Sequence, residues 1–366
     1  MKNVVEPLKV LIVDDAVVVR RVLAELIGKD PALKVVGTAQ DGRDGLEKMS
    51  LKPDVVVLDV EMPEVDGLQM LSELRRRGNK TPVVMFSSVT SRAATATMQA
   101  LAAGASDYVT KPTARGGGLD QVVPELVGKL KLYGSVARRK ATRGAPARAE
   151  RSTYTLRTAP LQRPQVLVVA SSTGGPMALT AVLPRLPSRI SVPVLVVQHM
   201  PNAVFTEAIS NTLAKLCQLP VEHAVAGRSV APGVIVVAAG GSHLVLSRAL
   251  TKGAPLVKLS SDPPLNGTRP AADALFKSAA DIYGAGVLAV VLTGMGQDGL
   301  AGAEAIVRAG GSVIVQDEAS SVVWGMPGVI AKAGLASAIL PLPEVADEIE
   351  KRFGAYAGRV ARGSTR

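Results

Sequence analysis

Short apolar runs alternate with amphipathic stretches over the first third of the chain. The runs LKVLIVDD, LKVVGTA, DVVVLDV, PVVMFSS and SDYVTK are rich in valine or isoleucine and end in acidic or turn residues, as buried parallel strands do. The stretches between them, such as VVVRRVLAELIGK and GLQMLSELRRRG, place apolar residues three or four positions apart, as helices do. Residues 1–133 are therefore expected to form a flavodoxin-like domain, a five-stranded, doubly wound parallel sheet.

The alternation stops in the middle of the chain and then returns. Residues 134–163 are filled with Arg, Ala, Thr and Pro, a composition typical of a flexible linker. Strand-like runs resume at QVLVVA and continue through VPVLVVQ, GVIVVAA, GVLAVVLTG and GSVIVQ. Residues 164–355 are expected to form a second doubly wound, mostly parallel α/β domain, followed by a basic tail over 356–366.

Length and charge agree with this division. A chain of 366 residues is long enough for two ordinary hydrophobic cores. The net charge of +11 could indicate nucleic-acid binding, but residues 134–163 contribute +7 and residues 351–366 contribute +5. The rest of the chain is close to neutral, and no helix-turn-helix pattern is evident, so no nucleic acid is expected as a partner.

Two further classes of protein are disfavoured by the sequence. No apolar run approaches the roughly 20 residues of a membrane span, and the first residues do not resemble a secretory signal. A cytoplasmic protein that is not integral to the membrane is expected. The single cysteine, Cys217, excludes an internal disulfide framework and a thiolate metal cluster.

Polar residues end four of the expected strands of the first domain. Asp14 and Asp15 follow the first strand, Asp59 ends the third, Ser87 ends the fourth and Lys111 follows the fifth. Because the carboxyl ends of parallel strands share one edge of the sheet, these side chains are expected to meet. Clustered carboxylates repel unless a cation lies among them, and an oxygen-only site suits Mg²⁺. Asp59 is the central carboxylate and the natural phosphoryl acceptor.

A single aspartate at a strand end often only caps the next helix, but four marked strand ends argue against that interpretation. The segments VDD, LDVEMPEVDG, MFSS and DYVTKP resemble the signature segments of response-regulator receiver domains, over about residues 8–132. The resemblance implies phosphorylation of Asp59. It assigns Mg²⁺ binding to Asp14, Asp15, Asp59 and the backbone carbonyl of Glu61, phosphoryl contacts to Ser87 and Lys111, and an aromatic switch to Tyr108.

A second group of polar residues follows the strands of the second domain. Ser172 lies in SSTGGP, directly after QVLVVA, where small residues at a strand-to-helix turn let backbone N–H groups approach a ligand. His199 follows VPVLVVQ, and Asp298 lies in the loop MGQDG after GVLAVVLTG. All three are expected at carboxyl ends of parallel strands, where a histidine could take the serine proton and the carboxylate could orient the histidine.

The spacing alone leaves other interpretations open. Ser172 could belong to a phosphate-binding turn, His199 could be a buried structural histidine, and Asp298 could cap a helix. The chain order Ser, His, Asp differs from the order Ser, Asp, His of α/β-hydrolases, which disfavours an ordinary lipase or esterase. The remaining histidines, His223 and His243, have no comparable context and are expected to be structural or surface residues.

Five segments of the second domain resemble consecutive motifs of chemotaxis protein-glutamate methylesterases, over about residues 165–350: STGGP, QHMP, KLSSDPPLNGTRPAADALFKSAA, LTGMGQDG and QDEASSVVWGMP. The resemblance implies that Ser172 is the nucleophile, His199 the general base and then acid, and Asp298 the orienting carboxylate. It assigns the oxyanion hole to the backbone N–H groups of Thr173 and Met295.

The chain departs from the family at one place. The family usually has Gly-Ala before the nucleophile, where this chain has Ala170 and Ser171. Ser171 could be mistaken for the nucleophile, although alignment on TGG favours Ser172. Arg269 and Trp324 also fall within family-like motifs, where substrate placement, a domain interface or simple packing are alternatives.

The resemblance also implies a function. The substrate class is the γ-methyl ester of glutamate on methyl-accepting chemoreceptors, which is hydrolysed to glutamate and methanol. No cofactor is expected for this hydrolysis. The same chemistry is expected to deamidate receptor glutamine. A chemotaxis histidine kinase is the expected phosphodonor, and the unphosphorylated receiver is expected to cover the active-site mouth. A scaffold without catalysis and a DNA-binding regulator are the alternatives.

Overall fold

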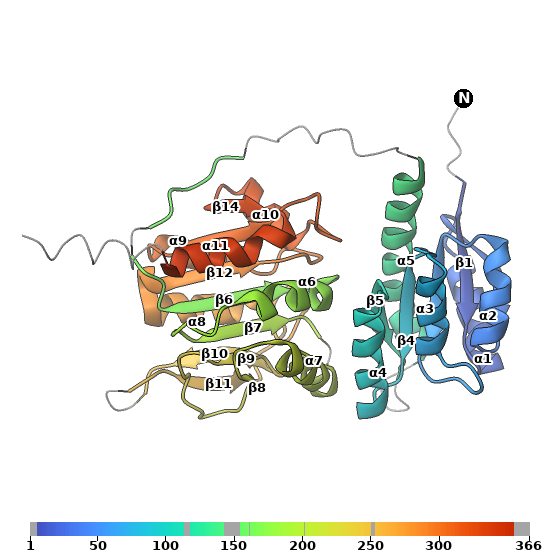
Figure 1. Ribbon diagram of the computed structural model, residues 1–366, viewed down its shortest axis with the longest axis horizontal. Coiled ribbons are helices and arrows are strands. Elements are labelled where there is room, and N and C mark those ends of the chain that lie inside the picture. Colours follow the sequence, from blue (N-terminus) through green and yellow to red (C-terminus); the bar gives the residue numbers. More distant parts are fainter. Residues whose placement is uncertain are drawn as a thin grey trace, which may run out of the picture. The chain divides into compact units, whose positions relative to one another are not determined.

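The computed structural model describes residues 6–112, 118–142, 154–160, 162–200, 202–249 and 253–354. The chain divides into two compact units, Met1–Ala149 and Glu150–Arg366, and Figure 1 shows that each contains a sheet and helices. No helix in the described ranges is both long and apolar enough to cross a membrane.

The first unit is built on a five-stranded sheet with the order β2-β1-β3-β4-β5, in which all neighbours are parallel. This confirms the predicted flavodoxin-like domain. The strands are β1 (Leu8–Val13), β2 (Leu33–Ala39), β3 (Val55–Asp59), β4 (Val83–Ser87) and β5 (Asp107–Thr110). Every residue of β3 and β4 is buried, as expected for central strands that are covered on both faces.

Helices cover both faces of this sheet. Helix α5 contacts α1, whereas α3 contacts α2 and α4, which gives two groups of helices (Figure 1). Their bounds are α1 (Val17–Gly28), α2 (Gly42–Lys48), α3 (Gly67–Arg76), α4 (Ser91–Ala102) and α5 (Leu119–Thr142), with a 3₁₀ turn at Met49–Leu51.

Helix α5 extends beyond the expected end of the domain. Residues 134–142, assigned to the linker from composition, are helical. The extension has tertiary contacts: Gly134 lies against Leu8, and the Arg138 guanidinium donates to the carbonyl of Pro7 at 3.0 Å and pairs with the Asp54 carboxylate. The basic residues here therefore belong partly to a packed helix. Of the rest of the expected linker, residues 154–160 and 162–163 form neither helix nor strand, while residues 143–153 and 161 lie outside the described residues, as does the tail over 356–366.

The second unit is built on a seven-stranded sheet with the order β14-β13-β12-β6-β7-β9-β8. All neighbours are parallel, which confirms the second α/β fold. The strands are β6 (Val166–Ser171), β7 (Val194–Gln198), β8 (Val221–His223), β9 (Ile235–Val237), β12 (Val287–Val291), β13 (Ser312–Gln316) and β14 (Ala338–Leu340). An antiparallel pair, β10 (His243–Ser247) and β11 (Leu256–Ser260), forms a separate small sheet.

Two groups of helices accompany the larger sheet. Helix α6 contacts α7 and α11, while α9 contacts α8 and α10. Their bounds are α6 (Gly175–Val182), α7 (Ala203–Leu216), α8 (Ala272–Tyr283), α9 (Leu300–Arg308), α10 (Met326–Lys332) and α11 (Leu342–Gly354), with 3₁₀ turns at Leu183–Arg185 and Gly284–Gly286.

The strand order gives each sheet one topological switch point, where the direction of winding reverses. In the first sheet the chain winds outward in opposite directions from β1 and β3, and in the second from β6 and β12. Doubly wound sheets bind ligands at the carboxyl ends of the strands on either side of such a switch point. Asp14, Asp15 and Asp59 lie at the ends of β1 and β3, and Ser172 and Asp298 follow β6 and β12, whereas His199 follows the neighbouring strand β7.

Candidate functional site

The acidic cluster of the first unit lies at its switch point. One carboxylate oxygen each of Asp14, Asp15 and Asp59 lies within 4.8 Å of the others. Asp14 and Asp59 are only 1% and 3% exposed, whereas Asp15 is exposed. The ammonium of Lys111 donates to Asp14 Oδ2 at 2.8 Å and to Asp59 Oδ2 at 2.7 Å. The structure thus brings together the three predicted carboxylates and the predicted lysine.

Burial sets the electrostatics of this cluster. Burial raises the pKa of Asp59 to about 6, and the charge of Asp14 adds to the rise, while Lys111 opposes it. Burial alone would lower the pKa of Lys111, but the Asp59 and Asp14 carboxylates outweigh it and raise the pKa. The cluster has three carboxylates and one ammonium, which contacts two of them. It therefore keeps excess negative charge, and every atom that could bind a cation is oxygen. These residues fit a hard divalent cation such as Mg²⁺.

The other predicted residues of this unit lie around the cluster. Ser87 is fully buried, and its hydroxyl lies 2.8 Å from that of Thr97. Tyr108 is 6% exposed, and burial raises the pKa of its phenol well above the usual value. The backbone N–H of Glu61 lies 3.4 Å from Asp59 Oδ1, but no contact tests the predicted metal role of its carbonyl.

The Ser172 turn joins β6 to α6 at the switch point of the second unit. Strand β6 ends at Ser171, and Gly174 adopts a left-handed φ of 75° immediately before α6. The Ser172 carbonyl accepts from the Gly175 N–H at 2.7 Å, which closes the turn. Ser172 therefore lies just ahead of a helix N-terminus, whose partial positive charge stabilises developing negative charge.

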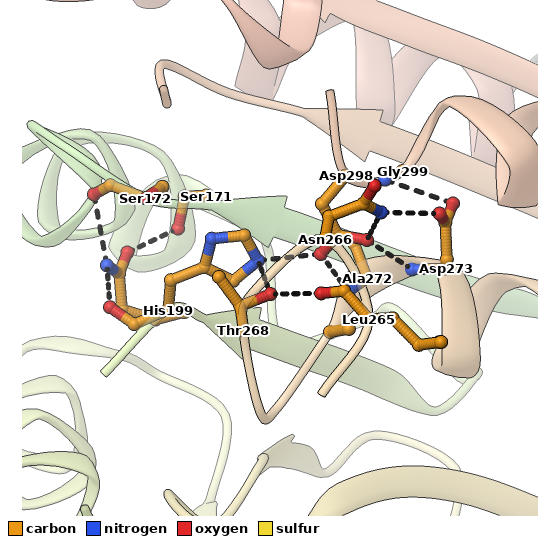
Figure 2. Close-up of polar contacts among 12 residues, drawn as sticks. Ser171, Ser172, His199, Leu265, Asn266, Thr268, Ala272, Asp273, Asp298 and Gly299 are labelled. Carbon is orange, nitrogen blue, oxygen red and sulfur yellow. Dashed lines mark hydrogen bonds and ion pairs between the residues drawn. The ribbon is translucent and has the colours of Figure 1, made fainter. Parts of the chain in front are cut away.

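Gln198 contacts the two neighbouring serines in different ways, through the side chain of Ser171 and through the backbone of Ser172. Ser171 is fully buried, and its hydroxyl donates to Gln198 Oε1 at 2.6 Å. Gln198 Nε2 donates to the carbonyls of Ser172 and His199, each at 3.0 Å. Figure 2 draws as dashed lines these three contacts of the Gln198 side chain, with the Ser171 hydroxyl and with the carbonyls of Ser172 and His199. Because the Ser171 hydroxyl is buried and already bonded, Ser172, which is partly exposed, is the better placed of the two to meet a substrate.

Gly175 lies so close to Gln198 that it accepts no side chain. A Cβ at this position would lie 2.0 Å from Gln198 Oε1 and 2.8 Å from Ser171 Cβ. Gly175→Ala is therefore expected to destabilise the second unit by about 1–3 kcal/mol, a typical cost of overpacking. Denaturant unfolding followed by the fluorescence of Trp324, the single tryptophan, would measure it.

Gly354→Ala is the matched control for Gly175→Ala. Gly354 lies in α11 of the same unit, and a Cβ there meets nothing within 4 Å. Equal unfolding free energies for the two variants would contradict the close packing of the Ser172 turn against Gln198.

The predicted histidine and aspartate are paired. His199 Nε2 lies 2.7 Å from Asp298 Oδ2, and the two side chains are 8% and 2% exposed. Asp298 also accepts the N–H groups of Ala272 at 2.6 Å and Asp273 at 3.1 Å. Burial alone would raise the pKa of Asp298, but the contact with His199 and these two N–H groups outweigh it and lower the pKa. An ionised Asp298 fixes the proton of the imidazole on Nε2.

Pairing of His199 through Nε2 leaves Nδ1 as the ring nitrogen that can act as a base. In Figure 2 this second nitrogen lies on the side of the ring that faces the serine turn. Within the described ranges no hydrogen bond joins Ser172 to His199, so the nucleophile and base pairing stays a prediction. Catalytic hydrogen bonds often form only when the substrate is bound.

Thr293 fixes the segment that carries Met295 against the Ser172 turn. The Thr293 carbonyl accepts from the Ser172 N–H at 3.0 Å, and its hydroxyl donates to the Thr173 carbonyl at 3.0 Å. Its own N–H donates to the buried Gln316 side chain at 2.8 Å. Among the described residues no acceptor is found for the N–H groups of Thr173 and Met295. Both groups are thus free for the predicted oxyanion hole.

Several residues of this network were not predicted from the sequence. Thr293 and Gln316 lie inside the quoted motifs, but neither is titratable, so nothing singled them out. Asn266 and Asp273 contact Asp298 or its loop, and the Thr268 hydroxyl lies 3.4 Å from His199 Nε2. Asn266, Thr268 and Asp273 also lie inside a quoted motif, KLSSDPPLNGTRPAADALFKSAA, and the only further local signal was the Asn-Gly pair at 266–267, which is typical of a turn.

The remaining histidines and motif residues have structural contacts. The ring of His243 accepts from the Ala271 N–H at 3.2 Å and donates to the Pro263 carbonyl at 3.1 Å. His223 bonds the Thr206 hydroxyl at 2.9 Å.

The Arg269 guanidinium donates to two carbonyls of its own loop, and the Trp324 indole N–H donates to the Gln316 carbonyl at 2.8 Å. These contacts favour packing roles for all four.

Comparison with known proteins agrees with the division into two units. Residues 167–349 match the CheB methylesterase family, and residues 10–122 match the response regulator receiver domain. A protein-glutamate methylesterase/protein-glutamine glutaminase of Nocardioides sp. is 46% identical, over 94% of this chain and 95% of that protein. A protein of the same name from Trichodesmium erythraeum is 41% identical, over 94% and 99%. The solved catalytic domain of Thermotoga maritima CheB methylesterase is 37% identical, over 51% of this chain and 98% of that chain, with a TM-score of 0.49.

Proposed function

The chain belongs to the CheB methylesterase family, and we propose that it hydrolyses glutamate γ-methyl esters on methyl-accepting chemoreceptors under the control of its receiver domain. It is a hydrolase of the protein-glutamate methylesterase/protein-glutamine glutaminase type. The observation that best supports the chemistry is the buried contact of His199 with Asp298 at 2.7 Å, at the switch point that also carries Ser172. A histidine held by a carboxylate next to a serine turn is the arrangement that activates a serine nucleophile, which favours an enzyme over a scaffold without catalysis.

The proposed reaction begins with attack on the ester carbonyl carbon. The Ser172 oxygen forms the new bond while His199 Nδ1 takes the hydroxyl proton, and Asp298 stabilises the imidazolium that forms. The carbonyl oxygen becomes an oxyanion, which the N–H groups of Thr173 and Met295 receive. Of the proposed roles, stabilisation of this charge is expected to be the largest single contribution.

Collapse of this intermediate breaks the bond to the methoxy group. His199 returns its proton to the leaving oxygen, so that methanol departs and an acyl ester of Ser172 remains. Water then attacks the acyl carbon with His199 again as base, which restores the serine and releases the glutamate carboxyl. A receptor glutamine presents the same carbonyl and would lose ammonia by the same steps.

The substrate class has a direct test. Membranes that contain methylated receptors should release methanol when the protein is added, and membranes whose receptors carry glutamine at the same sites should release ammonia. Receptors with glutamate at these sites are the control and should release neither. Methanol release no faster than without the protein would contradict the proposed substrate.

In the receiver, Asp14, Asp15 and Asp59 would hold Mg²⁺, with the Glu61 carbonyl as a proposed fourth ligand. The cation, when bound, neutralises charge on the phosphoryl oxygens during transfer. Asp59 is the proposed acceptor, Lys111 already lies 2.7 Å from its carboxylate, and Ser87 and Tyr108 are proposed to respond to phosphorylation. A chemotaxis histidine kinase is the proposed phosphodonor.

Asp59→Asn is expected to abolish stable phosphorylation, because an amide oxygen is a far weaker nucleophile than a carboxylate. Radioactive acetyl phosphate with Mg²⁺ should label the wild type and leave the variant unlabelled. Asp120→Asn, an exposed position in α5, is the matched control and should be labelled like the wild type. Equal labelling of Asp59→Asn would show that another residue is the acceptor.

A further inference from the structure

We infer that Asn266 is a positioning residue for ester hydrolysis, because its side-chain amide bridges the orienting carboxylate Asp298 and a second buried carboxylate, Asp273. The inference rests on the proposed function. The Asn266 Nδ2 group lies 3.0 Å from Asp273 Oδ2 and 3.4 Å from Asp298 Oδ1. Figure 2 shows the Asn266 amide between the carboxylates of the two aspartates.

The two aspartates are linked by reciprocal capping of helices. Asp298 precedes α9 and accepts the first N–H groups of α8, those of Ala272 and Asp273. Asp273 lies in the first turn of α8 and accepts the N–H groups of Gly299 at 3.0 Å and Gly302 at 2.7 Å, where α9 begins. Each carboxylate therefore satisfies donors that a helix N-terminus leaves free.

This arrangement forces two buried carboxylates close together. Asp273 is 5% exposed and Asp298 is 2% exposed. Burial raises the pKa of Asp273, and the charge of Asp298 raises it further, while Lys277 opposes the rise. If Asp273 took up a proton, the carboxyl could become a donor and the capping pattern would change. A neutral group that donates to both aspartates reduces the repulsion without adding charge.

An asparagine amide is suited to this position. Its nitrogen carries two hydrogens, one for each carboxylate, and its oxygen lies 3.5 Å from Gln297 Nε2 on the other side. Asn266 also has a φ of 51°, a left-handed conformation that asparagine tolerates better than most residues. The side chain is exposed, so its replacement leaves the hydrophobic core intact.

The same loop also reaches the histidine. The Thr268 hydroxyl lies 3.4 Å from His199 Nε2 and 3.1 Å from the Leu265 carbonyl. Displacement of Asn266 would therefore move a loop that borders both members of the His199 and Asp298 pair. A shift of about 1 Å in a catalytic group can reduce the rate by about 100-fold.

Two substitutions separate positioning from folding. Asn266→Gly removes the amide and permits the same backbone conformation, whereas Asn266→Asp keeps the side-chain shape and replaces the amide by a carboxyl group. Of the titratable groups around this position, Asp273 and Asp298 contact Asn266 directly. His199 pairs with Asp298 and Lys277 acts on Asp273, while Asp262 and Arg269 belong to the same loop. Asn211→Asp, at an exposed position in α7, is the matched control for added charge.

Methanol release should distinguish these variants by its pH dependence. Asn266→Gly should lower kcat by about tenfold at every pH, a loss within the range that misplacement of a catalytic group can cause. Asn266→Asp should lower kcat on the order of 100-fold at pH 8, where a third carboxylate repels the other two. Its activity relative to the wild type should rise towards pH 6, because protonation of the new carboxyl supplies a donor again.

The outcomes separate this inference from the proposed function. If the wild type releases methanol and Asn266→Asp keeps the same fraction of wild-type activity as Asn211→Asp at every pH, Asn266 has no positioning role. Lower unfolding midpoints with unchanged kcat would mark a purely structural residue and also overturn the inference. Absence of methanol release from the wild type would instead remove the proposed function.

Discussion

Ser172→Ala is expected to reduce methanol release by about 10⁵- to 10⁶-fold, the size of loss seen when a catalytic-triad serine is removed. Alanine has no oxygen with which to form the acyl intermediate, and the histidine and aspartate pair has nothing to activate. The variant should fold normally, because the turn is held by backbone contacts, including the 2.7 Å bond from Gly175 N–H to the Ser172 carbonyl. Single-turnover methanol release, with intact unfolding behaviour, would measure the effect.

Ser171→Ala provides a stringent control for this result, because the two serines are adjacent. Its hydroxyl donates to Gln198 Oε1 at 2.6 Å, and the loss of one neutral hydrogen bond costs about 1 kcal/mol. The variant is therefore expected to keep its chemistry and to lose a little stability. If Ser171→Ala were the inactive variant and Ser172→Ala the active one, the assignment of the nucleophile would be reversed.

Asp298→Asn is expected to reduce the rate by about 10⁴-fold, as the equivalent change does in a serine protease. Both oxygens of Asp298 accept hydrogen bonds: Oδ2 lies 2.7 Å from His199 Nε2 and 2.6 Å from the Ala272 N–H, and Oδ1 lies 3.1 Å from the Asp273 N–H. An amide has only one oxygen, so whichever way it turns, its NH₂ group faces at least one donor. The change therefore disturbs the histidine tautomer as well as the start of α8.

Two measurements distinguish loss of catalysis from loss of fold in this variant. The pH profile of kcat/KM should change, since the imidazolium loses its stabilising charge, while Trp324 fluorescence reports whether the unit still folds. Asp281→Asn, at an exposed position in α8, is the matched control and should keep wild-type kinetics. Near-normal activity of Asp298→Asn would contradict its role as the orienting carboxylate.

The sheets could be predicted from the sequence because their signal is local. Runs such as VVVLD in β3 are apolar almost throughout, and parallel strands that are buried on both faces require this. Once the strands were placed, the rule that ligands bind at their carboxyl ends put Asp59, Ser172, His199 and Asp298 at sheet edges. The structure brings Asp59 to Lys111 and His199 to Asp298 in this way.

The features that could not be predicted depend on contacts between distant segments. Composition predicted that the linker begins at residue 134, but helix α5 continues to Thr142. The contact that holds this part of α5 joins Arg138 to Asp54, which is far away in the sequence. The bridge from Asn266 to Asp273 and Asp298 depends on where two helices begin in space. Alignment on TGG already favoured Ser172 over Ser171, but the contact that occupies the Ser171 hydroxyl depends on Gln198, which belongs to the next strand.

Methanol release from methylated chemoreceptor membranes, with and without Mg²⁺ and a small phosphodonor, is the decisive test of a receiver-controlled methylesterase. The wild type should release methanol, and release should become faster with the phosphodonor, while Ser172→Ala should stay at background under both conditions. No release from the wild type under either condition would contradict the esterase function on these receptors. Release that the phosphodonor leaves unchanged would contradict control by the receiver.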